Sequence, residues 1–254
     1  MIFYFSSTGN SKYVAARIAE STKDEMVSIT DCRKTGLHCF SVKPEESIGI
    51  ISPTYFFGLP TIVCDFLENV EFLSEKKPYV YFVATYGSIC GQPGTMANQY
   101  LTPKGYPFDA GYNIKMPDMW TPFFDLSDKE KVRKINERAE PEINEVICQI
   151  DRKEKGDFMK NKSPGFAARI YYKFYDKQRT TKHFHVEDTC IGCGLCAKKC
   201  PVDAIIIPNN KPVWTKDKCV ICLGCLHRCP KFAIQYGRNT KKHGQYMHSD
   251  IEAQ

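Results

Sequence analysis

A cysteine motif that occurs twice constrains this chain more than any other feature. Residues 190–201 read C-I-G-C-G-L-C-A-K-K-C-P and residues 219–230 read C-V-I-C-L-G-C-L-H-R-C-P, so both follow the spacing C-x2-C-x2-C-x3-C-P. The sequences V-D-A-I-I and K-F-A-I-Q follow the two prolines and align with each other, which indicates an internal duplication. This spacing is typical of iron–sulfur ligands, because three thiolates two residues apart wrap a tight loop around one cluster.

Structural zinc and disulfides are the alternatives for so many cysteines. Zinc sites typically combine one C-x2-C pair with a second, distant pair of ligands. Disulfides would not need two copies of one motif in the same phase. The double motif therefore favours iron–sulfur clusters over both.

The double motif resembles that of bacterial two-cluster ferredoxins, in which the fourth cysteine of each copy binds the other cluster. The resemblance implies two [4Fe-4S] clusters with crossed ligation. One cluster is expected on Cys190, Cys193, Cys196 and Cys229, and the other on Cys219, Cys222, Cys225 and Cys200. His183 and His185 precede the first motif and are expected not to be ligands, since eight cysteines suffice.

Thirteen cysteines in 254 residues also bear on the compartment. Eight of them as cluster ligands fit a reducing environment, so we expect a cytoplasmic protein. No apolar run approaches the length of a membrane span, and the N-terminal apolar run is too short for a secretory signal. The remaining cysteines share no spacing and are expected to be inert, with Cys90 the one exception considered.

The formal charge is distributed unevenly between two parts of the chain. Residues 1–150 carry −4 and residues 151–254 carry +10, which gives the total of +6. Such a split predicts parts with different roles. No nucleic-acid recognition motif accompanies the basic part, so we expect no nucleic acid. We expect redox partner proteins with an acidic docking surface. The sequence is compatible with a monomer and with a homo-oligomer.

A strand–loop–helix unit at the N-terminus predicts a phosphate site. An apolar run at residues 2–5 is followed by S-S-T-G-N-S and then by a helical pattern. Backbone N–H groups at a helix start and nearby hydroxyls can bind a phosphate. The loop has neither the G-K-[ST] of a Walker A loop nor a G-x-G-x-x-G fingerprint, and such a turn can also be only a helix cap.

The pattern S-x-T-G-N-[ST] after the first strand resembles the FMN phosphate loop of flavodoxins. That resemblance implies FMN bound by Ser6, Ser7, Thr8, Gly9, Asn10 and Ser11. Two further loops follow predicted strands and are expected to meet the flavin ring, because ligands of such sheets bind at the carboxyl ends of strands. The candidates there are Pro53, Thr54, Tyr55, Phe56, Phe57 and Gly58, and Thr85, Tyr86, Gly87, Ser88 and Gly91. One of the three aromatic residues is expected to stack on the ring.

The predicted elements give an α/β fold. The strands are expected at residues 2–5, 26–29, 47–51, 78–84 and 108–115, with helices between them and a long final helix capped by Ser127. Pro141 is expected to kink or split that helix. The fold class is therefore a flavodoxin-like, doubly wound parallel sheet of five strands in the order 2-1-3-4-5, with a C-terminal α+β two-cluster ferredoxin domain.

Four segments are expected along the chain. They are a flavodoxin-like FMN-binding domain at 1–151, a basic helical connector at 152–183, a two-[4Fe-4S] ferredoxin domain at 184–237 and a polar, partly mobile tail at 238–254. The connector helix begins near Ser163-Pro164 and carries Phe166, Ile170 and Phe174 on one face. We expect that helix to pack on a domain with its Lys and Arg in solvent; a membrane-surface or acidic-partner helix is the alternative.

The chain as a whole resembles the EFR-type ferredoxin family, in which a flavodoxin-like domain is fused to a two-cluster ferredoxin domain. The resemblance implies electron transfer between redox partner proteins through two [4Fe-4S] clusters and FMN. The alternative is a flavin-dependent oxidoreductase that reduces a quinone, a nitroaromatic or oxygen. Without a nicotinamide fingerprint or an obvious proton donor in the flavin loops, the sequence favours the carrier and predicts no catalytic residue. Clusters with a purely structural role in a binding protein are a third interpretation.

Overall fold

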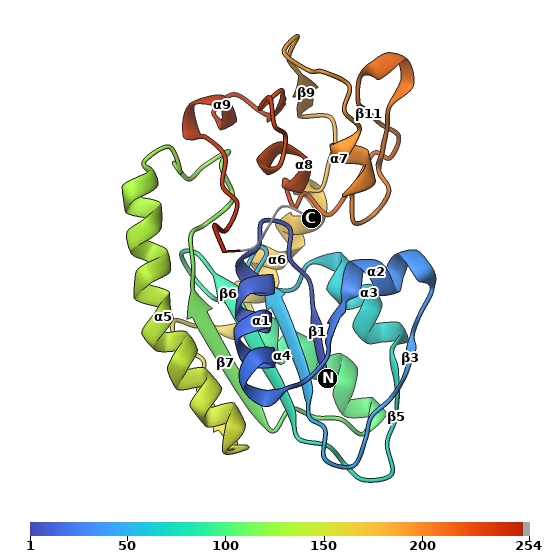
Figure 1. The fold of residues 1–254 in the computed structure, drawn as a ribbon, viewed down its shortest axis with the longest axis vertical. Helices are drawn as coiled ribbons and strands as arrows, with labels where there is room; N and C mark the ends of the chain where they lie inside the picture. The colour runs from blue at the N-terminus through green and yellow to red at the C-terminus, as the bar shows by residue number, and fades with distance from the viewer. Residues whose placement is uncertain (251–254) are drawn as a thin grey trace.

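A parallel sheet of six strands forms the centre of the N-terminal half, the lower part of Figure 1. The computed structural model describes residues 1–250. The strand order is β2-β1-β4-β6-β7-β8. The strands are β1 (Ile2–Tyr4), β2 (Met26–Ser28), β4 (Ile48–Pro53), β6 (Val80–Tyr86), β7 (Ala110–Lys115) and β8 (Gly156–Asp157). The first five have the predicted order, so the doubly wound fold is confirmed. The sixth comes from the connector, and its two residues are too few for a sequence pattern.

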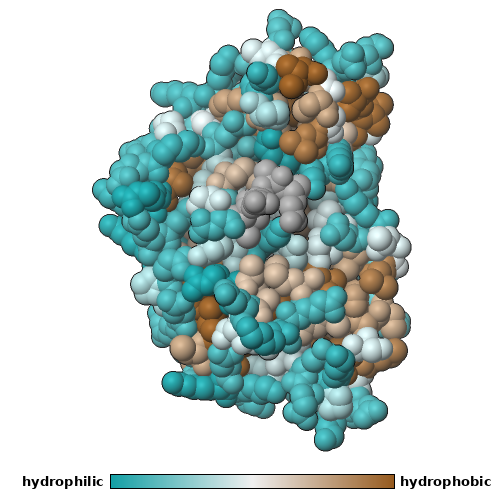
Figure 2. All heavy atoms as spheres, viewed as in Figure 1, coloured by the Kyte–Doolittle hydropathy of each residue, from teal (hydrophilic) through white to brown (hydrophobic). Residues whose placement is uncertain are grey.

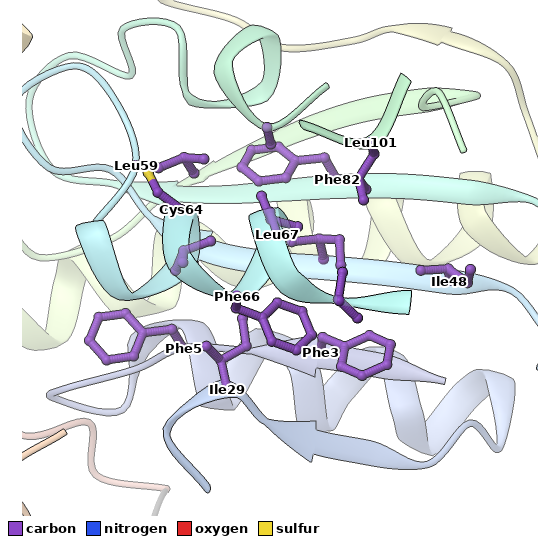
Figure 3. Packing of buried hydrophobic residues seen from close by; sticks show 14 of the residues in the cluster. Phe3, Phe5, Ile29, Ile48, Leu59, Cys64, Phe66, Leu67, Phe82 and Leu101 are labelled. Carbon is purple, nitrogen blue, oxygen red and sulfur yellow. The ribbon is translucent and has the colours of Figure 1, made fainter. Parts of the chain in front are cut away.

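Apolar side chains alternate between the two faces of this sheet, as the pleat requires. Phe3, Ile50 and Phe82 pack under α2 (Ile29–Thr35), α3 (Thr61–Asn69) and α4 (Pro93–Leu101), as Figure 3 shows for Phe3 and Phe82. Ile51 and Tyr81 pack on the other face, under α1 (Asn10–Thr22) and α5 (Lys129–Asp151). At the edge, β3 (Cys39–Ser41) pairs with β5 (Glu71–Leu73), and a 3-10 turn at Thr102–Lys104 follows α4.

Helix α5 corrects one sequence expectation, its cap, and excludes the splitting that was one of two outcomes expected at Pro141. Its cap is Asp128 rather than Ser127, because the Asp128 carboxylate accepts the N–H of Lys131 at 3.0 Å. It also runs through Pro141 as one helix and is not split. Proline removes only one backbone hydrogen bond, and the buried stripe that includes Ala139 and Ile143 holds both sides against the sheet.

The C-terminal half repeats a short helix and a hairpin strand twice, in the upper part of Figure 1. Helix α7 (Leu195–Lys198) belongs to the first motif and α8 (Gly224–His227) to the second. Antiparallel pairs join β9 (Phe184–Val186) to β12 (Ile234–Tyr236) and β10 (Ile205–Ile206) to β11 (Val213–Trp214). A 3-10 turn at Pro208–Asn210 links β10 and β11.

The connector and the tail both pack against the two halves. Helix α6 (Gly165–Gln178) buries Ala168 and Tyr175, and the Tyr175 hydroxyl donates to the Val220 carbonyl at 3.0 Å. Within residues 238–250, the tail forms α9 (Thr240–His243) and then packs on the protein, with Tyr246 and His248 buried. The last residues of the predicted tail, 251–254, lie outside the described residues. In residues 1–250 no helix is both long and apolar enough to cross a bilayer.

Candidate functional site

A cavity of about 430 Å³ opens at the carboxyl ends of β1, β4 and β6. That volume lies within the range of small-molecule sites. Fourteen of the seventeen predicted flavin residues line it: Ser6, Ser7, Thr8, Asn10, Ser11, Pro53, Thr54, Tyr55, Phe56, Phe57, Thr85, Tyr86, Gly87 and Ser88. Gly9, Gly58 and Gly91 do not. Gly58 packs on the ring of Tyr172 and Gly91 on the backbone of Phe57.

Two hydroxyls of the phosphate loop, residues 6–11, donate to a weak acceptor. Ser7 and Thr8 are almost fully buried, and both hydroxyls donate to the thioether sulfur of Met119, at 3.2 and 3.5 Å. A thioether is a poor acceptor, so a phosphate oxygen would be a much stronger partner for either hydroxyl. Helix α1 begins at Asn10 and adds backbone N–H groups that have no acceptor within the helix. These residues fit the phosphate of FMN.

The aromatic loop, residues 53–58, is a tight turn held against α6. Tyr55 and Gly58 exchange two backbone hydrogen bonds of 2.9 Å, and Phe56 and Phe57 between them have left-handed φ values of 46° and 67°. The Phe57 ring stacks on Tyr171 with centroids 4.6 Å apart. All three aromatic residues therefore reach the cavity wall, and the connector helix fixes their position.

The second flavin loop, residues 85–91, packs closely on a third loop at residues 117–124. A Cβ at Gly87 would lie 2.2 Å from the Cβ of Asp118, so only glycine allows this approach. Burial raises the pKa of Asp118, whose carboxylate accepts the N–H of Trp120 at 3.2 Å. Thr85 shares a 2.8 Å hydrogen bond with Ser11 and so ties this loop to the phosphate loop. Cys90 is fully buried and does not line the cavity.

Nine cavity residues were not among the predicted site residues: Ile89, Pro117, Asp118, Met119, Trp120, Phe123, Phe124, Tyr171 and Ile221. Six come from the third loop, which the sequence indicated only as a long crossing between strand and helix. The run M-P-D-M-W-T-P-F-F follows β7 directly, and its position at a carboxyl strand end was the available signal. Tyr171 and Ile221 come from the connector and the second cysteine motif, where no local sequence pattern indicates that they line this cavity.

The tail covers the outer side of the phosphate loop. The backbone N–H of His248 donates to the Thr8 carbonyl at 2.8 Å, and its ring stacks on Tyr13 at 4.1 Å. The Tyr246 hydroxyl donates to the Asn10 side-chain oxygen at 2.5 Å. Gly9 has φ 103°, and a Cβ there would lie 2.8 Å from the Cβ of His248. The tail therefore fixes the loop from behind.

A buried histidine joins the tail to both halves. His227 accepts the N–H of Tyr246 on Nδ1 at 3.2 Å, so its Nε2 carries the proton and donates to the Met119 carbonyl at 2.8 Å. Burial lowers the pKa of His227 to about 4. Arg228 beside it donates to the Ser7 carbonyl at 2.6 Å, which places a cation from the second motif next to a loop that has none.

Deleting residues 246–254 should therefore weaken FMN binding. The deletion removes the two hydrogen bonds to Asn10 and Thr8, each worth about 1 kcal/mol, so the dissociation constant should rise roughly thirtyfold. Fluorescence titration of flavin-free protein measures this. Tyr246→Phe removes one of the two bonds and should give an intermediate value. An unchanged FMN affinity in a truncated protein that retains its iron would show that the tail does not support the loop.

The eight motif cysteines separate into two groups, each around its own small cavity. We call Cys190, Cys193, Cys196 and Cys229 the outer set, and Cys200, Cys219, Cys222 and Cys225 the inner set. Each set contains the fourth cysteine of the other motif. In the inner set three members are only 8% exposed, whereas Cys193 of the outer set is exposed. All eight are free thiols in the structure.

Both sets fit ligands of an iron–sulfur cluster. Burial raises the pKa of Cys222 to about 12 and that of Cys196 to about 11, and a metal that binds such thiols displaces their protons. Within residues 1–250, no three His, Cys, Asp or Glu side chains are arranged to hold one metal ion. The cysteines surround cavities instead, which suits a cluster of several atoms.

Backbone N–H groups point at the fourth cysteine of each motif. Ala204 donates to Cys200 Sγ and Ala233 to Cys229 Sγ, each at 3.3 Å. These alanines are the ones that align in the internal duplication. Hydrogen bonds to ligand sulfur help to set the reduction potential of a cluster. The repeated apolar sequence after each proline thus places the same donor on both fourth cysteines.

One residue lies both next to the inner set and in the wall of the cavity described above. Ile221 lies between Cys219 and Cys222, is 3% exposed and forms part of the cavity wall. Its φ is 45°, a left-handed value that is strained for a β-branched residue. The equivalent residue of the first motif is Gly192, with φ 67°. The second motif therefore has a large apolar side chain where the first has none.

Family models match two separate parts of the chain. A family model described as a flavodoxin domain matches residues 1–143, and one described as a 4Fe-4S binding domain matches residues 184–206. No curated protein matches the chain.

Similar solved structures come from several bacteria. Flavodoxin of Megasphaera elsdenii is 21% identical over 46% of this chain and 87% of its own, with a TM-score of 0.33. Rubredoxin oxygen:oxidoreductase of Desulfovibrio gigas is 17% identical over 56% of this chain and 35% of its own, with a TM-score of 0.34. An FMN-dependent NADH-azoreductase of Bacillus anthracis is 10% identical over 59% and 97%, with a TM-score of 0.36. Since the first family model covers more than half of the 254 residues, the chain belongs to the flavodoxin domain family and carries a 4Fe-4S binding domain near its C-terminus.

Proposed function

We propose that this chain is an EFR-type electron carrier that passes electrons between redox partner proteins through two [4Fe-4S] clusters and one FMN. A flavodoxin domain and a 4Fe-4S domain in one chain support a role in flavin and iron–sulfur electron transfer. A cluster exchanges single electrons and a flavin one or two, so the combination allows single electrons to be stored or paired. We propose a reducing, cytoplasmic location for it.

The single observation that supports this proposal most is the position of Ile221. Its side chain belongs both to the loop of the inner set and to the wall of the flavin cavity, so no other layer of protein separates them at this point. Tyr55 lies at the same boundary. Its hydroxyl is 3.4 Å from that of Ser7, and burial followed by the nearby Cys222 thiol raises its pKa well above the ordinary value.

The residues then have distinct roles in the proposal. The phosphate loop would hold the FMN phosphate, and the aromatic, second and third loops would enclose the ring and exclude water. The inner set would bind the cluster next to the flavin, and the outer set the cluster next to solvent. Electrons from a protein donor would therefore reach the outer set first.

The surface around the outer set suits a protein donor. Ile191, Ile206 and Val213 are 59%, 50% and 46% exposed, and brown residues gather at the top of the molecule in Figure 2, over the C-terminal half. Residues 151–254 carry +10 before any cofactor is counted. Exposed apolar residues on a half with this net positive charge favour a donor with an acidic surface, and its association should weaken as salt rises.

A second candidate function is reduction of a small apolar acceptor at the flavin. The observation that favours it is the wall of the cavity at its mouth, where Phe123 is 75% and Ile89 41% exposed. An aromatic quinone or nitroaromatic would suit such a mouth. In this case too, electrons would arrive through the clusters.

Anaerobic purification should yield about eight iron, eight sulfide and one FMN per chain. Metal and sulfide assays, with chromatography of the flavin released on denaturation, measure the load. A stepwise reductive titration then separates cluster and flavin signals. Protein with one or two metal ions would contradict the cluster assignment, and released FAD would contradict the identity of the flavin.

A further inference from the structure

The connector helix α6 has apolar residues on two opposite faces, and only one face is covered. Tyr172 and Tyr175 point into the protein, where the Tyr172 hydroxyl donates to the Leu59 carbonyl at 2.7 Å. Phe166, Ile170 and Phe174 recur every fourth residue on the other side, at 73%, 55% and 48% exposure. We call these three residues the outer ridge. A helix that is buried on one side only would normally present polar residues there.

A row of cations runs beside the outer ridge. Arg169, Lys173 and Lys177 recur at the same spacing of four and are all exposed. The Lys177 ammonium lies 5.8 Å from the centre of the Phe174 ring. Ten basic and three acidic residues occur between 152 and 182, so the surroundings add to this charge.

The outer ridge is continuous with the mouth of the flavin cavity. Tyr171, next to Ile170, is 51% exposed, stacks on Phe57 and lines the cavity. The exposed Phe123 lies at the same mouth. An apolar surface flanked by cations therefore extends from α6 to the opening above the flavin site.

We propose that α6 docks this protein on the surface of an anionic membrane, with the outer ridge in the head-group region and the cations on lipid phosphates. Aromatic and aliphatic residues beside a row of Lys and Arg are the composition of helices that lie in a membrane interface. A bilayer also accepts a protruding ridge without a complementary groove. Docking in this way would turn the mouth of the cavity toward the lipid. This proposal does not depend on the proposed electron carrier function.

The row of cations favours a membrane over a second copy of the chain as the partner of the outer ridge. Two copies related by a two-fold axis would bring their ridges together with the rows of cations close to each other, and like charges at an interface are unfavourable. Anionic lipid attracts the same cations, at about 1 kcal/mol for each Lys or Arg near the surface. The row thus favours the membrane over self-association.

Co-sedimentation of the holoprotein with vesicles tests the proposal. We expect it to pellet with equimolar phosphatidylglycerol and phosphatidylcholine, and far less with pure phosphatidylcholine. The double variant K173Q/K177Q should lower the partition coefficient roughly thirtyfold. The double variant F166S/F174S should lower it roughly tenfold or more, because each phenyl ring loses an apolar environment. The variant L37S/L73S is the matched control, because Leu37 and Leu73 are 49% and 57% exposed on the flavodoxin domain, away from α6. It should bind to the vesicles as the wild type does.

Iron and flavin contents equal to the wild type establish that each variant is folded. The proposal is overturned if the holoprotein does not pellet with the anionic vesicles, or if it pellets equally with both lipids. It is also overturned if the two α6 variants bind as well as L37S/L73S. A dimer in vesicle-free ultracentrifugation that F166S/F174S dissociates would assign the ridge to a second copy instead. Vesicle binding is measured without electron transfer, so this test can succeed even if the protein does not act as an electron carrier.

Discussion

Replacing Cys200 by alanine should remove the inner cluster and leave the outer one. Cys200 belongs to the first motif in sequence but lines the cavity of Cys219, Cys222 and Cys225. It is 8% exposed, and its sulfur accepts the N–H of Ala204. A cluster with three thiolates in a buried site is poorly held, so bound iron should fall from about eight to about four per chain. The domain should also lose stability, because each cluster links the two motifs.

Reference variants identify which cluster is lost. Cys219→Ala should remove the inner cluster and Cys190→Ala the outer one, and electron paramagnetic resonance of the reduced proteins gives a spectrum for each. The spectrum of Cys200→Ala should match Cys219→Ala. A match to Cys190→Ala would show that the ligation is not crossed. Cys148→Ala, at an exposed cysteine of α5 outside both motifs, should retain all of its iron.

Replacing Thr8 by valine should weaken FMN binding about tenfold to a hundredfold. Valine keeps the shape of threonine and removes only the hydroxyl, which in this structure has a thioether as its acceptor. A hydrogen bond from that hydroxyl to a charged phosphate is worth about 1.5–3 kcal/mol. Fluorescence titration of the flavin-free protein gives both dissociation constants.

Riboflavin provides the matched control for Thr8→Val, because it has the same ring without the phosphate. Its affinity should be the same for wild type and variant. Equal losses for FMN and riboflavin would mean that the substitution disturbs the ring site, and no loss for FMN would mean that the phosphate lies elsewhere.

The sheet and the two groups of cysteines could be predicted from the sequence because the patterns that indicate them are local. Strands such as the one at 80–84 are apolar runs, and their order follows from the doubly wound topology that the phosphate loop indicates. The motif cysteines have a spacing that few other structures use. Fourteen predicted flavin residues line one cavity for the same reason, since each of their loops follows a predicted strand.

The rest depends on contacts between segments far apart in the sequence. Ile221 reaches the flavin cavity because the two halves pack together, and nothing in the motif distinguishes it except the glycine at the equivalent position. The tail has a polar composition, so its packing is not predictable; it is held by single contacts such as His248 on Tyr13. Asp128 rather than Ser127 caps α5 because adjacent residues can both serve, and geometry decides between them.

Anaerobic stopped-flow reduction tests the central claim, that the clusters supply the flavin, most directly. The wild type and Cys200→Ala, each loaded with FMN, are mixed with a reduced low-potential ferredoxin, and separately with NADH or NADPH. We predict rapid flavin bleaching by the ferredoxin in the wild type, slowed by salt and largely lost in Cys200→Ala, with little bleaching by either nicotinamide. Rapid, saturable bleaching by NADH or NADPH alone, or equal rates in both proteins with the ferredoxin, would contradict it.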